Sequence, residues 1–126
     1  MSTAVFTTLQ SSGGTVPTET IRRTIPRAEI NFNQVGTTSI RGSFNVSSVT
    51  DIGVGTTDVN LTNALSNANY VATSAGGSDN VSNNCYVVAG NQAAGIKSTT
   101  TCRVALVNAA GSAADTVEPT VAFAEV

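Results

Sequence analysis

Short runs in which apolar and polar residues alternate fill most of the chain from residue 28 onward. A period of two is typical of strands that turn one face to a core. The runs are separated by Gly, Asn, Asp and Ser, which favour turns. The pattern predicts strands at 28–33, 39–46, 49–52, 58–61, 69–74, 85–89, 101–108 and 120–126. The fold class that follows is all-β, an antiparallel β-sandwich of about seven or eight strands.

The same alternation predicts which side chains face the core. Four large side chains lie on the apolar faces of their predicted strands, and we expect them to share one core: Phe32, Ile40, Phe44 and Phe123. Glycines at 53 and 55 can adopt the positive φ values of a tight turn, which predicts a hairpin there. The segment 101–108 is apolar on both faces. This pattern favours burial of both faces, one by the core and the other by a second copy of the chain in an oligomer.

Residues 1–27 follow a different pattern and predict an extended N-terminal arm before a sandwich domain at 28–126. Gly13, Gly14, Pro17 and Pro26 interrupt any regular element longer than 4–10. The segment has few large apolar residues, and burial of these cannot offset the entropy that is lost when the segment becomes ordered without a partner. We therefore expect the arm to attach the protein to a partner through its apolar and basic side chains, namely Phe6, Leu9, Ile21, Arg22, Arg23 and Arg27.

Composition argues against catalysis. Ser, Thr and Asn supply 44 of the 126 residues, against 14 charged residues and no His. Without His there is no base for a serine triad, and no spacing of acids matches a calcium loop. We expect no enzymatic activity, no cofactor and no metal. The net charge of −2, without blocks of like charge or a long apolar run, predicts no nucleic-acid partner and no membrane insertion.

Two cysteines, Cys85 and Cys102, lie in separate apolar runs. They cannot complete a tetrahedral zinc site on one chain. No secretory signal precedes them, so we expect synthesis in the cytoplasm, where thiols stay reduced. Buried thiols are the favoured interpretation, and a disulfide between neighbouring strands is the alternative.

The segment 31–51, Asn-Phe-Asn-Gln-Val-Gly-Thr-Thr-Ser-Ile-Arg-Gly-Ser-Phe-Asn-Val-Ser-Ser-Val-Thr-Asp, resembles the opening strands of a small β domain in structural and tail-fibre-like proteins of tailed bacteriophages, including cyanophage-like and other aquatic phages. Matches to the same family follow at 58–64, 67–70 and 121–124, and residues 7–14 are similar to its N-terminal segment. Glu29-Ile30 departs from the family, whose members often carry Trp there, and 75–118 matches poorly.

The resemblance implies a setting in the virion, on the tail or the capsid surface. We expect a tail-fibre or receptor-binding subunit, a homotrimer that contacts other virion proteins of the tail or baseplate and a bacterial surface glycan. Its candidate receptor loops lie at 75–84 and 90–101, with these polar residues: Ser78, Asp79, Asn80, Asn83, Asn84, Asn91, Gln92 and Lys97. The alternative is a capsid decoration or cement protein whose arm staples the major capsid protein. A tail-spike depolymerase is the weakest option, since no carboxylate pair is evident.

Overall fold

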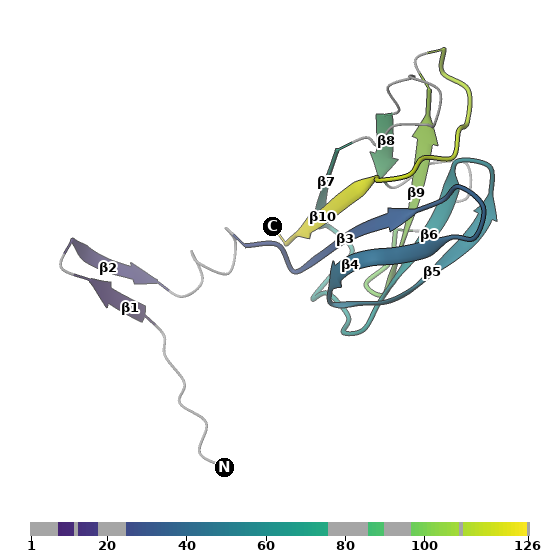
Figure 1. Cartoon of the computed structure of the whole chain (residues 1–126). Coiled ribbons are helices and arrows are strands. Elements are labelled where there is room, and N and C mark those ends of the chain that lie inside the picture. The colour runs from purple at the N-terminus through teal and green to yellow at the C-terminus, as the bar shows by residue number, and fades with distance from the viewer. Residues whose placement is uncertain are drawn as a thin grey trace.

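A computed structural model describes residues 8–11, 13–17, 25–75, 86–89, 97–108 and 110–125 of the chain. Two antiparallel sheets of four strands pack face to face, as the sequence predicts (Figure 1). The first sheet has the order β4 (Ser39–Phe44), β3 (Ala28–Asn33), β10 (Thr120–Ala124) and β7 (Val71–Ala75). The second has the order β5 (Val46–Gly53), β6 (Thr56–Leu61), β9 (Thr101–Val107) and β8 (Tyr86–Ala89). The all-β sandwich of about eight strands is thus confirmed.

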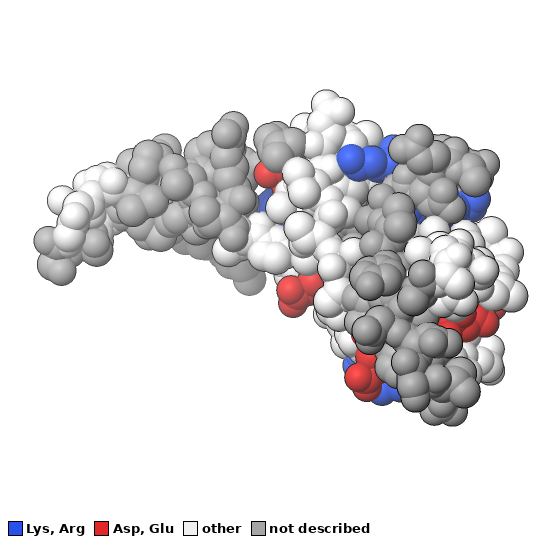
Figure 2. Space-filling view, turned by 90° about the horizontal axis from the view of Figure 1, so that it is seen from above, with Lys and Arg blue, Asp and Glu red and all other residues white. Residues whose placement is uncertain are grey.

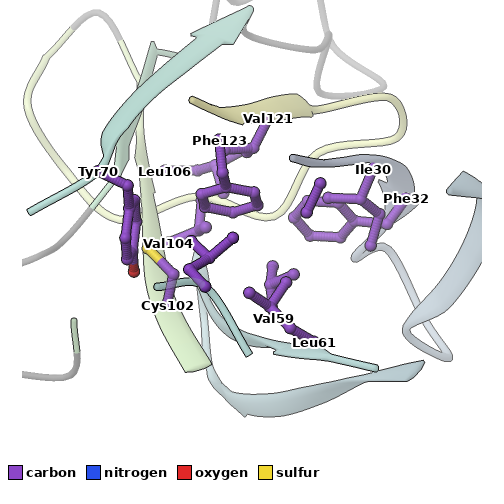
Figure 3. Packing of buried hydrophobic residues seen from close by; sticks show 12 residues of the cluster. Ile30, Phe32, Val59, Leu61, Tyr70, Cys102, Val104, Leu106, Val121 and Phe123 are labelled. Atoms are coloured by element: carbon purple, nitrogen blue, oxygen red, sulfur yellow. The ribbon is translucent and has the colours of Figure 1, made fainter. Parts of the chain in front are cut away.

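The core lies between the two sheets, and β3 and β10, the central strands of the first sheet, alternate buried positions with more exposed ones. Figure 3 shows side chains from both sheets converging on this space. Phe32 and Phe123 are completely buried there, as predicted. The ring of Phe123 meets that of Tyr70 edge to face, with centroids 5.6 Å apart. The rest of the cluster is mainly aliphatic: Ala28, Ile30, Val59, Leu61, Leu65, Cys102, Val104, Leu106 and Val121.

Ile40 and Phe44 are not part of the buried core that the sequence predicts for them. Phe44 is 58% exposed and Ile40 is 36% exposed. Gly42 pairs with Asn31 but Ile40 pairs with Phe32, so one extra residue of β4 forms a bulge. A bulge shifts the alternation of a strand by one residue. Ile40 therefore stays on the core side at the sheet edge, and Phe44 turns to the outer face opposite the exposed Glu29.

The predicted strand at 39–46 is divided into two by a corner at Asn45. Its φ of 55° is the one positive value of a non-glycine residue within the described ranges. Asn tolerates this conformation better than most residues because its short amide bonds the local backbone. The chain therefore leaves the first sheet after Phe44 and enters the second at Val46.

The predicted hairpin around residues 53–55 is confirmed and joins β5 to β6. Gly55 has a φ of 66°, and its carbonyl accepts a hydrogen bond of 2.7 Å from the amide of Leu106. An added Cβ at Gly55 would lie 2.6 Å from the Leu106 carbonyl oxygen and 2.7 Å from the Ala114 nitrogen. Glycine at this position is therefore required both by conformation and by space.

β9 has a covered inner face and a partly covered outer face. Cys102, Val104 and Leu106 are buried against the other sheet. On the outer face, Arg103 donates to both carboxylate oxygens of Asp58, at 2.6 and 2.8 Å. The sequence favours burial of this face by a second copy of the chain, but the Arg103–Asp58 pair of the same chain already occupies part of it.

The described part of the N-terminal segment forms a hairpin of β1 (Thr8–Ser11) and β2 (Gly14–Pro17). Leu9 lies opposite Val16 in its register. Figure 1 draws this hairpin apart from the two sheets. Of the element that the sequence allows at 4–10, residues 8–10 lie in β1, and residues 4–7 lie outside the described ranges.

Candidate partner-binding groove

A groove of about 490 Å³ lies where the chain enters the sandwich, and we call it the Phe44 groove. It is lined by two ends of strands and a connecting segment: residues 25–27, 44–45 and 62–65. Ile25 and Phe44, at its rim, are 50% and 58% exposed. Leu65 in its wall is buried. The groove therefore presents two large apolar side chains to solvent beside the buried Leu65.

The side chain of Asn45 fixes the shape of this groove. Its Nδ2 donates to the carbonyl oxygens of Arg27 and Asn63, at 3.0 and 3.1 Å. Its Oδ1 accepts from the backbone amide of Asn63 at 2.8 Å, and its own carbonyl accepts from the Thr62 amide at 3.1 Å. Three segments that are distant in sequence are thus held against one another around a single residue.

Glu125 holds the same region from the C-terminal side. One carboxylate oxygen lies 3.5 Å from Nε of Arg27, and the other accepts from the Ser66 amide at 2.6 Å. The Arg27 amide also donates to the Phe123 carbonyl at 2.7 Å. The walls of the groove are therefore joined to β10, and a partner would meet a preformed surface.

The candidate arm residues are only partly described. Phe6, Ile21, Arg22 and Arg23 lie outside the described residues, and Leu9 is described as part of β1. Arg27 is bonded to β10 and pairs with Glu125 of the same chain, so it belongs structurally to the edge of the sandwich. Contacts of these side chains with another protein stay a prediction.

Of the candidate receptor-loop residues, the structure describes Lys97 alone. Its side chain is exposed, and its Nζ lies 4.7 Å from the centre of the Tyr70 ring. Residue 97 also forms an isolated bridge with Cys102. The others lie outside the described residues: Ser78, Asp79, Asn80, Asn83, Asn84, Asn91 and Gln92. Cys85 does too, while Cys102 is buried in the core as expected.

The sequence interpretation missed the Phe44 groove because it placed Phe44 in the core. A signal was present at the next residue, since Asn between two strand patterns is a common choice for a corner. The role of Glu125 had no comparable signal. Its partners are 98 and 59 residues away along the chain, and only the fold brings them together.

A second groove, of about 610 Å³, runs over the outer face of the first sheet. Its floor consists of small side chains on four strands, including Gly42, Thr73, Ala75 and Ala122, with Glu29 and Asn31 among them. On β5 and β6, the outer face of the second sheet carries polar side chains instead. There Asn60 donates to the hydroxyls of Ser48 and Thr50, both at 3.1 Å.

The acidic side chains of the described segments mostly have structural partners. Asp58 binds Arg103, Glu118 binds Arg41, and Asp115 accepts a hydrogen bond from the Gly55 amide. The hydrogen bond from Arg103 to Asp58 raises the pKa of Arg103. Figure 2 shows acidic and basic residues as small separate groups on a mostly uncharged face. No cluster of three or more metal-binding side chains occurs among the residues that were placed.

No helix in the described part of the chain is long and apolar enough to cross a bilayer. Comparisons of the chain with protein-family models, with curated proteins and with solved structures found no match.

Proposed function

We propose that this chain is a non-enzymatic structural protein of a tailed-bacteriophage virion, a tail-fibre or receptor-binding subunit attached through its N-terminal segment. The observation that carries the proposal is the Phe44 groove. It combines exposed Ile25 and Phe44 with a framework of hydrogen bonds around Asn45, at the place where the N-terminal segment joins the sandwich. Exposed apolar surface on a preformed framework suits assembly with another protein.

The resemblance of residues 31–51 to tail-fibre-like proteins supports the choice of setting, and the physical character of the sandwich agrees with it. Both sheets are antiparallel and share one core. Such a body suits a particle component that must resist dilution and proteolysis without doing chemistry. Polar loops, with Lys97 at the end of one of them, would contact a bacterial surface glycan through many weak hydrogen bonds.

The experiment is to locate the protein on purified phage particles. Gold-labelled antibodies raised against residues 25–126 should bind the tail or its fibres in electron micrographs. Label spread over the head would instead support the capsid decoration role that the sequence left as an alternative. Particles without the protein, by both labelling and mass spectrometry, would refute a virion role of either kind.

A further inference from the structure

Two of the exposed large apolar side chains of the sandwich meet in one groove. Seven large ones are exposed in the described ranges: Ile25, Val35, Ile40, Phe44, Ile52, Val54 and Val71. Ile25 and Phe44 line the same groove, next to Leu65 and the ring of Pro26. Val54 lies in the β5–β6 turn, at the far end of the eight-residue strand β5. At about 3.3 Å per residue, this is roughly 26 Å from the corner at Asn45.

Addition of a strand to β4 does not explain the exposure of Phe44. The bulge at Arg41 interrupts the regular spacing of backbone groups along this edge strand. Arg41 also pairs with Glu118 at 3.0 Å, which places charge beside the edge. Bulges and charges on edge strands oppose pairing with another sheet. A partner at the groove would therefore pack against side chains.

The charge of the groove favours a partner with the same surface. Arg27 is the one ionisable side chain among the described residues lining it, and the Glu125 carboxylate lies 3.5 Å from its guanidinium. The region is thus locally neutral and holds both signs. Two copies can approach without net repulsion, whereas a strongly charged partner gains little.

The position of the groove also favours a second copy. Ile25 and Pro26 form one of its walls, and the N-terminal segment continues directly from them. In a cyclic assembly, each surface patch repeats around one axis. Contact at the groove would therefore bring the N-terminal segments of all copies out at one end. If several N-terminal segments attach to one site on the virion, they must leave the assembly on the same side. This step of the inference rests on the proposed function.

We propose that the Phe44 groove is the contact between copies of this chain, with Ile25 and Phe44 of one copy packed against the groove of the next. The contact consists of apolar side-chain packing at the N-terminal end of the sandwich. The opposite end, which carries Val54, stays outside it.

The test is light scattering of the full chain over a dilution series. Phe44→Ser and Ile25→Ser each remove one exposed apolar side chain from the groove, and Val54→Ser is the matched control at the other end. We expect the wild type and Val54→Ser to form the same oligomer. Both groove variants should dissociate at a protein concentration at least about tenfold higher, since burial of one such side chain contributes more than the free energy of a tenfold change.

Circular dichroism melting of each variant separates loss of contact from loss of fold. Because Ile25 and Phe44 are about half exposed, both variants should still melt cooperatively, with a midpoint lowered only by the loss of association. If one of them unfolds, the other still decides the outcome. A wild-type monomer, groove variants that associate like the wild type, or an equal loss in Val54→Ser would overturn the contact. The location of the protein on phage particles is measured separately, so failure here is distinct from failure of the proposed function.

Discussion

Phe123 and Phe44 have the same side chain and lie in the same sheet, but they face opposite sides of it. Phe123 is fully buried, whereas Phe44 is 58% exposed. In the monomer, Phe123→Ala should reduce the free energy of unfolding by about 3–5 kcal/mol through loss of packing and formation of a cavity. Phe44→Ala should cost less than about 1 kcal/mol, since little buried area is lost.

Urea unfolding followed by circular dichroism, at concentrations where the protein is monomeric, measures both changes. A cost for Phe44→Ala as large as that for Phe123→Ala would show that the bulge in β4 does not turn Phe44 outward.

Because of Tyr70, the stability of the fold should decrease at alkaline pH. Tyr70 is 2% exposed, and its phenol oxygen is buried, with the Cys102 thiol as its polar neighbour. Burial raises the pKa of Tyr70 far above its ordinary value of 10.0, and the Cys102 thiol adds to the increase. The folded protein therefore holds the phenol proton more tightly than the unfolded chain does. Stability is complete below about pH 10 and is lost as the pH rises further.

The variant Tyr70→Phe removes this titration. At neutral pH its free energy of unfolding should lie within about 1 kcal/mol of that of the wild type, because the polar neighbour of the lost hydroxyl is a thiol, which is a weak hydrogen-bond partner. Between about pH 9 and about pH 11 the wild type should lose more stability than the variant does. Stability curves that stay parallel over this range would contradict the buried position of the phenol.

From the sequence, the inward-facing side chains could be predicted only where apolar and polar residues alternate without interruption along a strand. Phe32 and Phe123 could be assigned to the core because their strands alternate without interruption. Phe44 could not, because a single extra residue, Arg41, reverses the face of everything after it. A bulge depends on how two strands pair, and that information is absent from either strand taken alone.

At the scale of elements, the β5–β6 hairpin depends on one glycine. Gly55 has a positive φ, and a Cβ there would overlap with backbone atoms of Leu106 and Ala114. Gly55→Ala should therefore cost at least about 2 kcal/mol, from strain and from displacement of the crossing segment. Gly42→Ala is the matched control, since Gly42 lies in a strand, β4, rather than in a turn. An added Cβ there meets nothing within 4 Å, so Gly42→Ala should be nearly neutral.

Thermal melting of the two alanine variants gives the comparison. Equal midpoints would mean that the turn can open without disturbing β9, contrary to the close approach at Gly55.

The elements themselves were largely predictable, and their connections were not. The range 28–33 matches β3 at both ends, and β6, β9 and β10 start or end within two residues of their predicted bounds. The corner at Asn45 was missed, because Phe44 and Val46 fit one apolar pattern that continues across it. The Phe44 groove was hidden for the same reason, since it exists only where that corner meets Arg27 and Asn63.

At the scale of the whole molecule, our proposal gives attachment to the virion to the N-terminal segment and contact with the bacterial surface to the sandwich. Arg27, the last residue of the expected arm, has its amide and its guanidinium both bonded to the end of the sandwich, so a shortened chain that begins at Ile25 keeps these contacts. The chain of residues 25–126 keeps every strand of the two sheets. It should therefore melt cooperatively, with a midpoint within a few degrees of that of the full chain.

The most direct test of the account is the amount of this protein in purified phage particles when residues 25–126 replace the full chain. Quantitative mass spectrometry of the particles measures it, and melting of the isolated proteins confirms that both are folded. We predict that the full chain is present and that the shortened chain is folded but missing from the particles. Incorporation of the shortened chain at the level of the full chain, or its failure to fold, would contradict attachment through the N-terminal segment.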